Sequence, residues 1–232
     1  VATIQHHGIE VTAGFIVGFD KEGDDVCNSI YEFCQKAGMP TVMVGLLIPA
    51  RGSLLYERLR CEGRLLEENP EGNNTHSFEL GYVPDRNRSA DRIIAGYKNL
   101  IRRLYPADGQ AYFERCRKLL SEIGTSPTFS RHVRLNEIRT FLRSLLRQST
   151  GKYGKAYRRF LADAFLKQRE SFPEAVRLAI TGHHFITITD YALQADEIRQ
   201  TLQERLETLR QKMDDVYRCR ANVQQQWSDF VS

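Results

Sequence analysis

Two short apolar runs separated by a helical pattern constrain the fold of this chain more than any other feature. Residues 9–19, IEVTAGFIVGF, and residues 41–49, TVMVGLLIP, have the apolar and β-branched composition of strands buried on both faces of a parallel sheet. Residues 24–38 between them have helical spacing that stops at Gly38, and residues 53–66 form a second helical pattern. The order strand, helix, strand, helix predicts a right-handed βαβ unit with parallel strands.

This unit is incomplete as a sheet, because two parallel strands are not stable by themselves. The chain also begins with Val1 and in the middle of a pattern, since residues 6–17 look like a helix end, a turn and a strand. We therefore expect the upstream part of the same polypeptide, or another chain, to supply the remaining strands.

The pattern changes after the second helix. Residues 67–90 are polar and rich in turn-forming residues, with one short strand pattern at 77–83, and helical spacing then dominates. We predict an α/β plus all-α fold in three parts, with boundaries 1–66, 67–90 and 91–232. The helical segments are predicted over 90–105, 109–123, 134–148, 155–168, 173–187 and 191–228.

Composition narrows the class of protein. With 41% hydrophobic and 27% charged residues the chain reads as globular. No run approaches the roughly 18 apolar residues that cross a membrane, and the N-terminal residues lack the pattern of a secretory signal. The five cysteines are scattered, odd in number and never spaced as CxxC, which indicates reduced thiols. We expect a cytoplasmic protein.

The segment GFIVGFD, residues 14–20, is the first candidate site. Ligands of parallel α/β folds lie at the carboxyl ends of the strands. Gly18 ends this strand and would let a flat ligand approach the backbone, while Ile16 offers an apolar contact and Asp20 lies at the mouth. The same residues also suit a buried strand with a glycine turn, in which Asp20 or Asp24 caps the next helix. The pattern is not the dinucleotide fingerprint GxGxxG.

GFIVGFD, the helix after it and TVMVGLLIPARGSLLYERLRCEGRLL together resemble the C-terminal part of a radical SAM barrel. In that family a GxIxGxxE-like motif on the fifth strand lies beside the adenine of S-adenosylmethionine (SAM), the sixth strand runs along the cofactor, and a PGTxLYxxLxxEGRLL-like tail follows. Residues 72–75, 93–116 and 172–185 resemble the helical extension of B12-binding-domain radical SAM proteins, a group that includes hopanoid methylases. The resemblance extends to about residue 190.

Two local departures from the family pattern are visible. The PGT turn reads ARGS here, at residues 50–53, with Pro49 displaced upstream. The usual glutamate after the second glycine is replaced locally by Asp20, with Glu22 close by.

The resemblance implies a set of cofactors and the residues that face one of them. The cofactors are SAM, a [4Fe–4S] cluster and, for the B12-dependent type, cobalamin. The CxxxCxxC loop that holds the cluster is absent and none of the five cysteines replaces it, so we expect the cluster ligands and any cobalamin domain upstream and assign no metal ligand here. One wall of the adenosyl pocket would be formed by Gly14, Ile16, Gly18, Asp20, Leu46 and Leu47.

The function that follows from the resemblance is catalytic. The complete protein would be a radical SAM enzyme, with B12-dependent methyl transfer as one possible reaction and a small molecule or a lipid as substrate. The helical extension would cover the substrate, no catalytic residue stands out, and the chain by itself would be inactive. The alternative is a non-catalytic basic helical module that binds RNA, a membrane surface or a protein.

The alternative function rests on a basic stretch. Residues 131–169 hold eleven Lys and Arg against two acidic residues. The simplest interpretation of residues 134–148 is an amphipathic helix with a solvated basic face, and the other two are a helix lying on anionic lipid and a patch facing RNA. No named RNA-binding motif is present, so the nucleic-acid signal is not firm.

Two further features concern packing. His183 and His184 are adjacent, so on a helix they point about 100° apart and rarely bind one metal, which favours packing and hydrogen bonding. In the last predicted helix, apolar residues step by four and three from Ile198 to Val216. This spacing predicts packing against another helix, within the chain or in a dimer.

Overall fold

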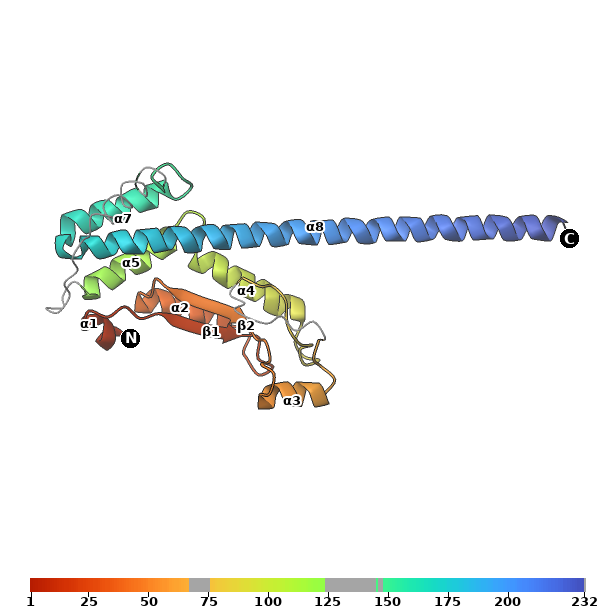
Figure 1. Ribbon diagram of the computed structural model, residues 1–232, viewed down its shortest axis with the longest axis horizontal. Helices are drawn as coiled ribbons and strands as arrows, with labels where there is room; N and C mark the ends of the chain where they lie inside the picture. The colour runs from red at the N-terminus through yellow and green to blue at the C-terminus, as the bar shows by residue number, and fades with distance from the viewer. Residues whose placement is uncertain (67–75, 124–144, 146–147, 232) are drawn as a thin grey trace. The chain divides into compact units, whose positions relative to one another are not determined.

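The computed structural model describes residues 1–66, 76–123, 145 and 148–231, with side chains as far as residue 218 (Figure 1). The chain divides into two compact units, Val1–Asp190 and Tyr191–Ser232, and each is described by itself.

A two-stranded parallel sheet begins the first unit after the short helix α1 (Ala2–His6). Strand β1 (Ala13–Val17) pairs with β2 (Val42–Leu46), and α2 (Val26–Ala37) connects them (Figure 1). Gly38 ends α2 in the left-handed conformation with φ 61°. The predicted strand–helix–strand unit is therefore present.

The two faces of this sheet have different surroundings. Val17, Val42 and Val44 are each 1% exposed and lie on the face that packs against helices. On the opposite face, Ile16 is 57% exposed and Met43 is 41% exposed. Strands buried on both faces were the prediction, so for these described residues one face of the sheet is open.

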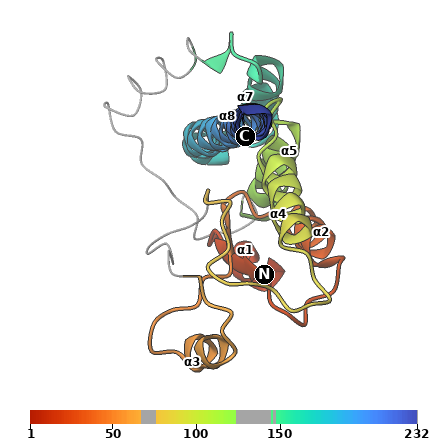
Figure 2. The same cartoon turned by 90° about the vertical axis from the view of Figure 1, so that its right-hand side faces the viewer.

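One of the helices that follow β2 covers the buried face of the sheet. After β2 comes α3 (Leu54–Cys61), whose first turn is capped by the Ser53 hydroxyl accepting the amide of Tyr56 at 3.2 Å. Helices α4 (Ala90–Leu104) and α5 (Gln110–Ile123) then pack against α2 (Figure 2). Helix α4 also packs against β2.

The strand predicted at residues 77–83 is wrong. This segment has no strand of its own, and among the described residues it pairs with the segment after α3 at one antiparallel bridge, between Leu65 and Tyr82. Its alternating residues Phe78, Leu80 and Tyr82 are buried, which explains the strand-like pattern.

The predicted division of the C-terminal helices is also wrong. Helix α7 (Gly154–Lys167) and the short 3₁₀ helix η1 (Arg169–Ser171) are followed by a single helix, α8 (Phe172–Val231). The two helices expected at 173–187 and 191–228 are continuous because no glycine or proline follows Gly182 to interrupt them. The helix predicted over 134–148 lies almost entirely outside the described residues.

A buried arginine joins the core helices. Arg115 of α5 is 1% exposed, and its guanidinium donates to the carbonyl oxygens of Met39 at 2.8 Å and Leu104 at 2.7 Å. It also donates to the side chain of Gln35 at 2.8 Å. These acceptors lie at the C-terminal ends of α2 and α4, where unpaired carbonyls and the helix dipoles favour a positive charge. Arg115 therefore links α2, α4 and α5.

The close crossing of α5 and the start of α8 depends on a glycine. The Tyr112 hydroxyl donates to the carbonyl of Leu178 at 2.7 Å, and its ring lies over Gly182, where a Cβ atom would clash with it.

In the part of the chain that the structure describes, no helix has the length and apolar character needed to span a bilayer.

Candidate functional site

The open face of the sheet carries two glycines that the chain itself does not require. A Cβ added at Gly14 or Gly45 would meet no described atom within 4 Å. Neither glycine has a positive φ, so neither the backbone nor local packing calls for glycine there. The missing side chains instead leave room for a group from outside the described residues to approach this face of the sheet.

The register places these glycines among apolar side chains. Gly14 pairs with Met43, and Ile16 pairs with Gly45, so a glycine and an exposed apolar side chain alternate across the two strands. Gly14 is exposed and Gly45 is partly exposed, and the apolar side chains of Ile16 and Met43 lie exposed beside them. A flat, partly apolar group suits such a surface, because a ring can lie against the backbone and be flanked by Ile16 and Met43.

Gly18 has a different role from Gly14. It has φ 108° and is buried, and a Cβ there would contact Ile93 at 3.4 Å and Leu80 at 3.7 Å. Its amide donates to Glu22 Oε2 at 2.7 Å, and its carbonyl accepts the hydroxyl of Tyr82. A turn that only glycine adopts without strain explains this residue, and a ligand contact at Gly18 stays a prediction.

The two leucines predicted to face the cofactor are also buried. Leu46 is 3% exposed and, by the alternation of β2, lies on the same face as Val42 and Val44, opposite Gly14. Leu47 is 6% exposed and lies beneath Gly18, 3.8 Å from the position of an added Cβ. Of the six predicted cofactor-binding residues, the structure brings Gly14 and Ile16 together on the open face.

Asp20 lies in the loop after β1 and is held by an arginine that the sequence analysis missed. Arg64 donates to both carboxylate oxygens, at 2.6 and 3.0 Å, and the amide of Asp85 donates at 3.1 Å. The hydrogen bond from Arg64 is the main reason that the pKa of Asp20 is lowered, and Asp20 in turn raises the pKa of Arg64. The pair ties the loop after β1 to the segment after α3. The only sequence signal was the position of Arg64 in the CEGRLL segment.

Replacing Asp20 with asparagine is expected to lower the free energy of unfolding by about 1.5–3 kcal/mol at pH 7, as for other hydrogen bonds to charged groups. The folded pKa of Asp20 lies below the reference value of 3.8, so its stabilisation is present above that pH and is lost as the pH falls through the folded pKa. The variant should therefore lose less stability than the wild type on acidification. Urea unfolding between neutral and acidic pH measures both effects.

Asp24→Asn is the matched control, since Asp24 is an exposed residue in the same loop. It should change the unfolding free energy by less than about 0.5 kcal/mol. Equal effects of the two substitutions would contradict the role given to the Asp20–Arg64 pair.

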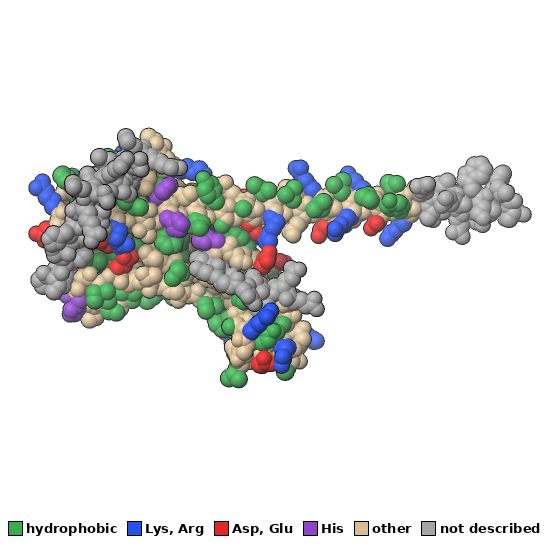
Figure 3. Space-filling model, viewed as in Figure 1, with side chains coloured by type: hydrophobic (Ala, Val, Ile, Leu, Met, Phe, Trp, Pro, Cys, Tyr) green, Lys and Arg blue, Asp and Glu red, His purple; other side chains and the backbone are tan. Residues whose placement is uncertain are grey.

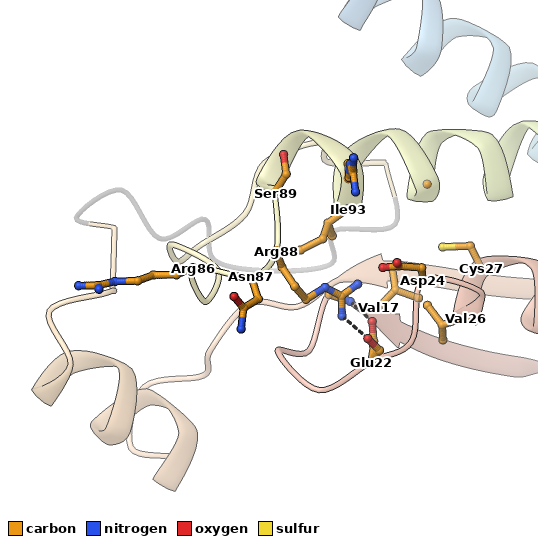
Figure 4. Close-up of a pocket in the computed structure, with 13 residues that line it drawn as sticks. Val17, Glu22, Asp24, Val26, Cys27, Arg86, Asn87, Arg88, Ser89 and Ile93 are labelled. Carbon is orange, nitrogen blue, oxygen red and sulfur yellow. Dashed lines mark hydrogen bonds between the residues drawn. The ribbon is translucent and has the colours of Figure 1, made fainter.

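A cavity of about 540 Å³ lies at the carboxyl end of β1, between the start of α2 and the segment that leads into α4. Figure 4 shows Arg88 reaching towards Glu22 while Arg86 points away from it. Arg88 donates to the carbonyl oxygens of Phe19 at 2.7 Å and Glu22 at 2.8 Å. The cavity is lined by Val17, which belongs to the buried face, so it is distinct from the open face.

The cysteine in this cavity is not activated. Burial, followed by the charge of Glu22, raises the pKa of the Cys27 thiol, which disfavours the thiolate that serves as nucleophile or metal ligand. Among the described residues, no three His, Cys, Asp or Glu side chains gather as a metal site would require.

The histidine pair of α8 is divided between two environments. His183 Nδ1 hydrogen bonds with the Tyr153 hydroxyl and lies 3.2 Å from Thr187 Oγ1. His184 is exposed and packs edge-to-face on Phe185. The hydrogen bond between His183 and Tyr153 joins α8 to the start of α7.

Comparison with known proteins gives one family and two relatives. Residues 54–198 match the model of a family described as Domain of unknown function (DUF4070). The chain is 29% identical over 117 residues to the uncharacterized methyltransferase sll1242 of Synechocystis sp., and 29% identical over 105 residues to the hopanoid C-2 methylase of Rhodopseudomonas palustris. No solved structure matches the chain significantly.

Each match covers a larger share of this chain than of the relative. They include 50% and 45% of this chain but only 21% and 18% of the respective relatives. The chain thus spans about a fifth of the length of these curated relatives.

Proposed function

Since the chain belongs to the family described as Domain of unknown function (DUF4070), we propose that it is part of a methylating radical SAM enzyme, and that β1 and β2 are strands of that enzyme's barrel. Two relatives carry methyltransferase and methylase names, which supports a methylating activity for the complete protein. One is named a hopanoid C-2 methylase, and a small-molecule or lipid substrate is proposed on that basis.

The observation that carries the proposal is the pair of glycines on the open face. Gly14 and Gly45 have no described atom within 4 Å of their Cβ positions, and they lie on the parallel strands where the family resemblance puts the adenosyl group. Ile16 and Met43 flank them with exposed apolar side chains. These residues fit the adenosyl part of SAM, because an aromatic ring gains most from a flat surface with apolar edges.

The work of this chain is to bind and orient the cofactor. When bound, SAM and its cluster supply the radical chemistry, and the protein supplies binding, orientation and exclusion of water. Ile16 and Met43 would hold the adenosyl group, and the Asp20–Arg64 pair would hold the loop above it in place. The described residues do not fit a cluster site, so we propose that cluster and cobalamin are held by other parts of the complete polypeptide.

The test is made on the complete polypeptide that contains this chain. After anaerobic reconstitution with iron and sulfide, we expect a [4Fe–4S] absorption and EPR signal, binding of SAM, and cleavage of SAM on reduction. Replacing the expected upstream cysteine triplet with alanine is the control and should remove the cluster signal and the cleavage. A complete polypeptide that lacks such a triplet and does not bind SAM would overturn the proposal.

A further inference from the structure

The second unit exposes a continuous row of apolar side chains along α8. Each member is between 55% and 67% exposed. At 3.6 residues per turn they fall within an arc of about 80°. We call this row the apolar stripe, and Figure 3 shows hydrophobic side chains following one another along this part of the helix. The stripe consists of Ile198, Leu202, Leu206, Leu209, Met213 and Val216.

The spacing of the stripe is that of a coiled coil. From Leu202 to Val216 the steps are four, three, four and three residues, which places successive members at the a and d positions of a heptad. A stripe this narrow differs from the wider apolar face, of about 100° or more, with which a helix packs onto a protein core. A single helix in water is also only marginally stable without a packing partner.

Charges are sorted around the stripe. Arg205, Arg210 and Lys212 lie within about 40° of its edges, at the e and g positions. The acidic residues of the same stretch lie at least about 120° from its centre, on the opposite face together with Arg218. They are Asp196, Glu197, Glu204, Glu207, Asp214 and Asp215.

This sorting decides which partner fits. In a coiled coil of two copies of this chain, the basic e and g residues would face other basic residues in the parallel and the antiparallel orientation, and like charges there are unfavourable. A helix with acidic e and g residues would instead form ion pairs on both sides of the stripe. We propose that the apolar stripe binds an amphipathic helix of another protein, with apolar a and d positions and acidic residues beside them.

The proposal is tested with the full chain and two synthetic peptides of 28 residues. Both peptides have leucine at a and d, and one has glutamate and the other lysine at e and g. We expect the full chain to bind the glutamate peptide at least about tenfold more tightly, by fluorescence anisotropy. The preference should weaken as salt is added, because exposed charge pairs are screened.

Three variants separate the stripe from its surroundings. Leu206→Asp with Leu209→Asp should remove binding, and both side chains are about half exposed, so the helix content measured by circular dichroism should be kept. Glu207→Gln with Asp214→Asn, on the opposite face, is the matched control and should bind as the wild type does. Exchanging Arg205, Arg210 and Lys212 for glutamate should switch the preference to the lysine peptide.

Three results would overturn the proposal. The first is equal affinity for the two peptides or binding to neither. The second is a dimer of the wild-type chain in sedimentation velocity that Leu206→Asp with Leu209→Asp dissociates, since this would identify a second copy as the occupant. The third is stripe-dependent binding to phosphatidylserine-containing vesicles without binding to the glutamate peptide, since this would identify a lipid surface.

Discussion

Replacing Gly14 and Gly45 together with valine is expected to weaken SAM binding by the complete enzyme at least about 100-fold, a loss of about 2.7 kcal/mol of binding free energy. The two side chains would fill the surface on which we propose that the adenosyl group lies. The fold should be retained, because a Cβ at either position meets no described atom within 4 Å. Valine also favours strand conformation, so the unfolding midpoint should not fall.

Two other glycines sharpen this experiment. Gly23 also has open space around its Cβ position and an ordinary φ, but it lies in the loop after β1, so Gly23→Val should leave both binding and stability unchanged. Gly18→Val is a poor probe, since its positive φ and its contacts with Ile93 and Leu80 make the substitution destabilising in itself. Wild-type SAM affinity in a folded Gly14→Val, Gly45→Val enzyme would contradict the assignment of the open face.

Replacing Arg115 with methionine is expected to lower the free energy of unfolding of the chain by about 2–6 kcal/mol, because each of two buried carbonyls that loses its donor costs about 1–3 kcal/mol. Methionine has a similar length, so the main loss is the hydrogen bonds to Met39, Leu104 and Gln35. The two carbonyls are left in a buried region with no donor to replace the guanidinium. Such a loss is a large part of the roughly 5–15 kcal/mol that stabilises most domains.

Arg117 on the same helix provides the matched control. Its side chain is 32% exposed and donates to Asp163 at 3.2 Å, so Arg117→Met should cost no more than about 1 kcal/mol. Chemical denaturation followed by circular dichroism compares the two variants directly. Similar losses for Arg115→Met and Arg117→Met would show that the carbonyl network does not carry the stability assigned to it.

Some features of the candidate site could be predicted from the sequence, and others could not. The GFIV part of GFIVGFD was correctly interpreted as a strand, but the reason for each glycine could not be read from the sequence. Gly14 faces an open surface, whereas Gly18 is covered by Leu80 and Ile93 from segments more than 60 residues away. Arg64 was missed for the same reason, because a single arginine in a helical tail carries no signal of its partner Asp20.

Local sequence alone determined most of the elements. The period of the apolar residues and stop signals such as Gly38 predicted β1, β2, α2, α4 and α5 to within a few residues. This was possible because the hydrogen bonds of helices, and the alternation of side chains between the faces of helices and strands, depend on neighbours a few positions away. Only the tertiary structure decided which sheet face is open, which glycine is structural and where Asp20 and Arg115 find their partners. Those outcomes depend on contacts between residues that are distant in sequence. Such contacts form only when the surrounding segments pack together.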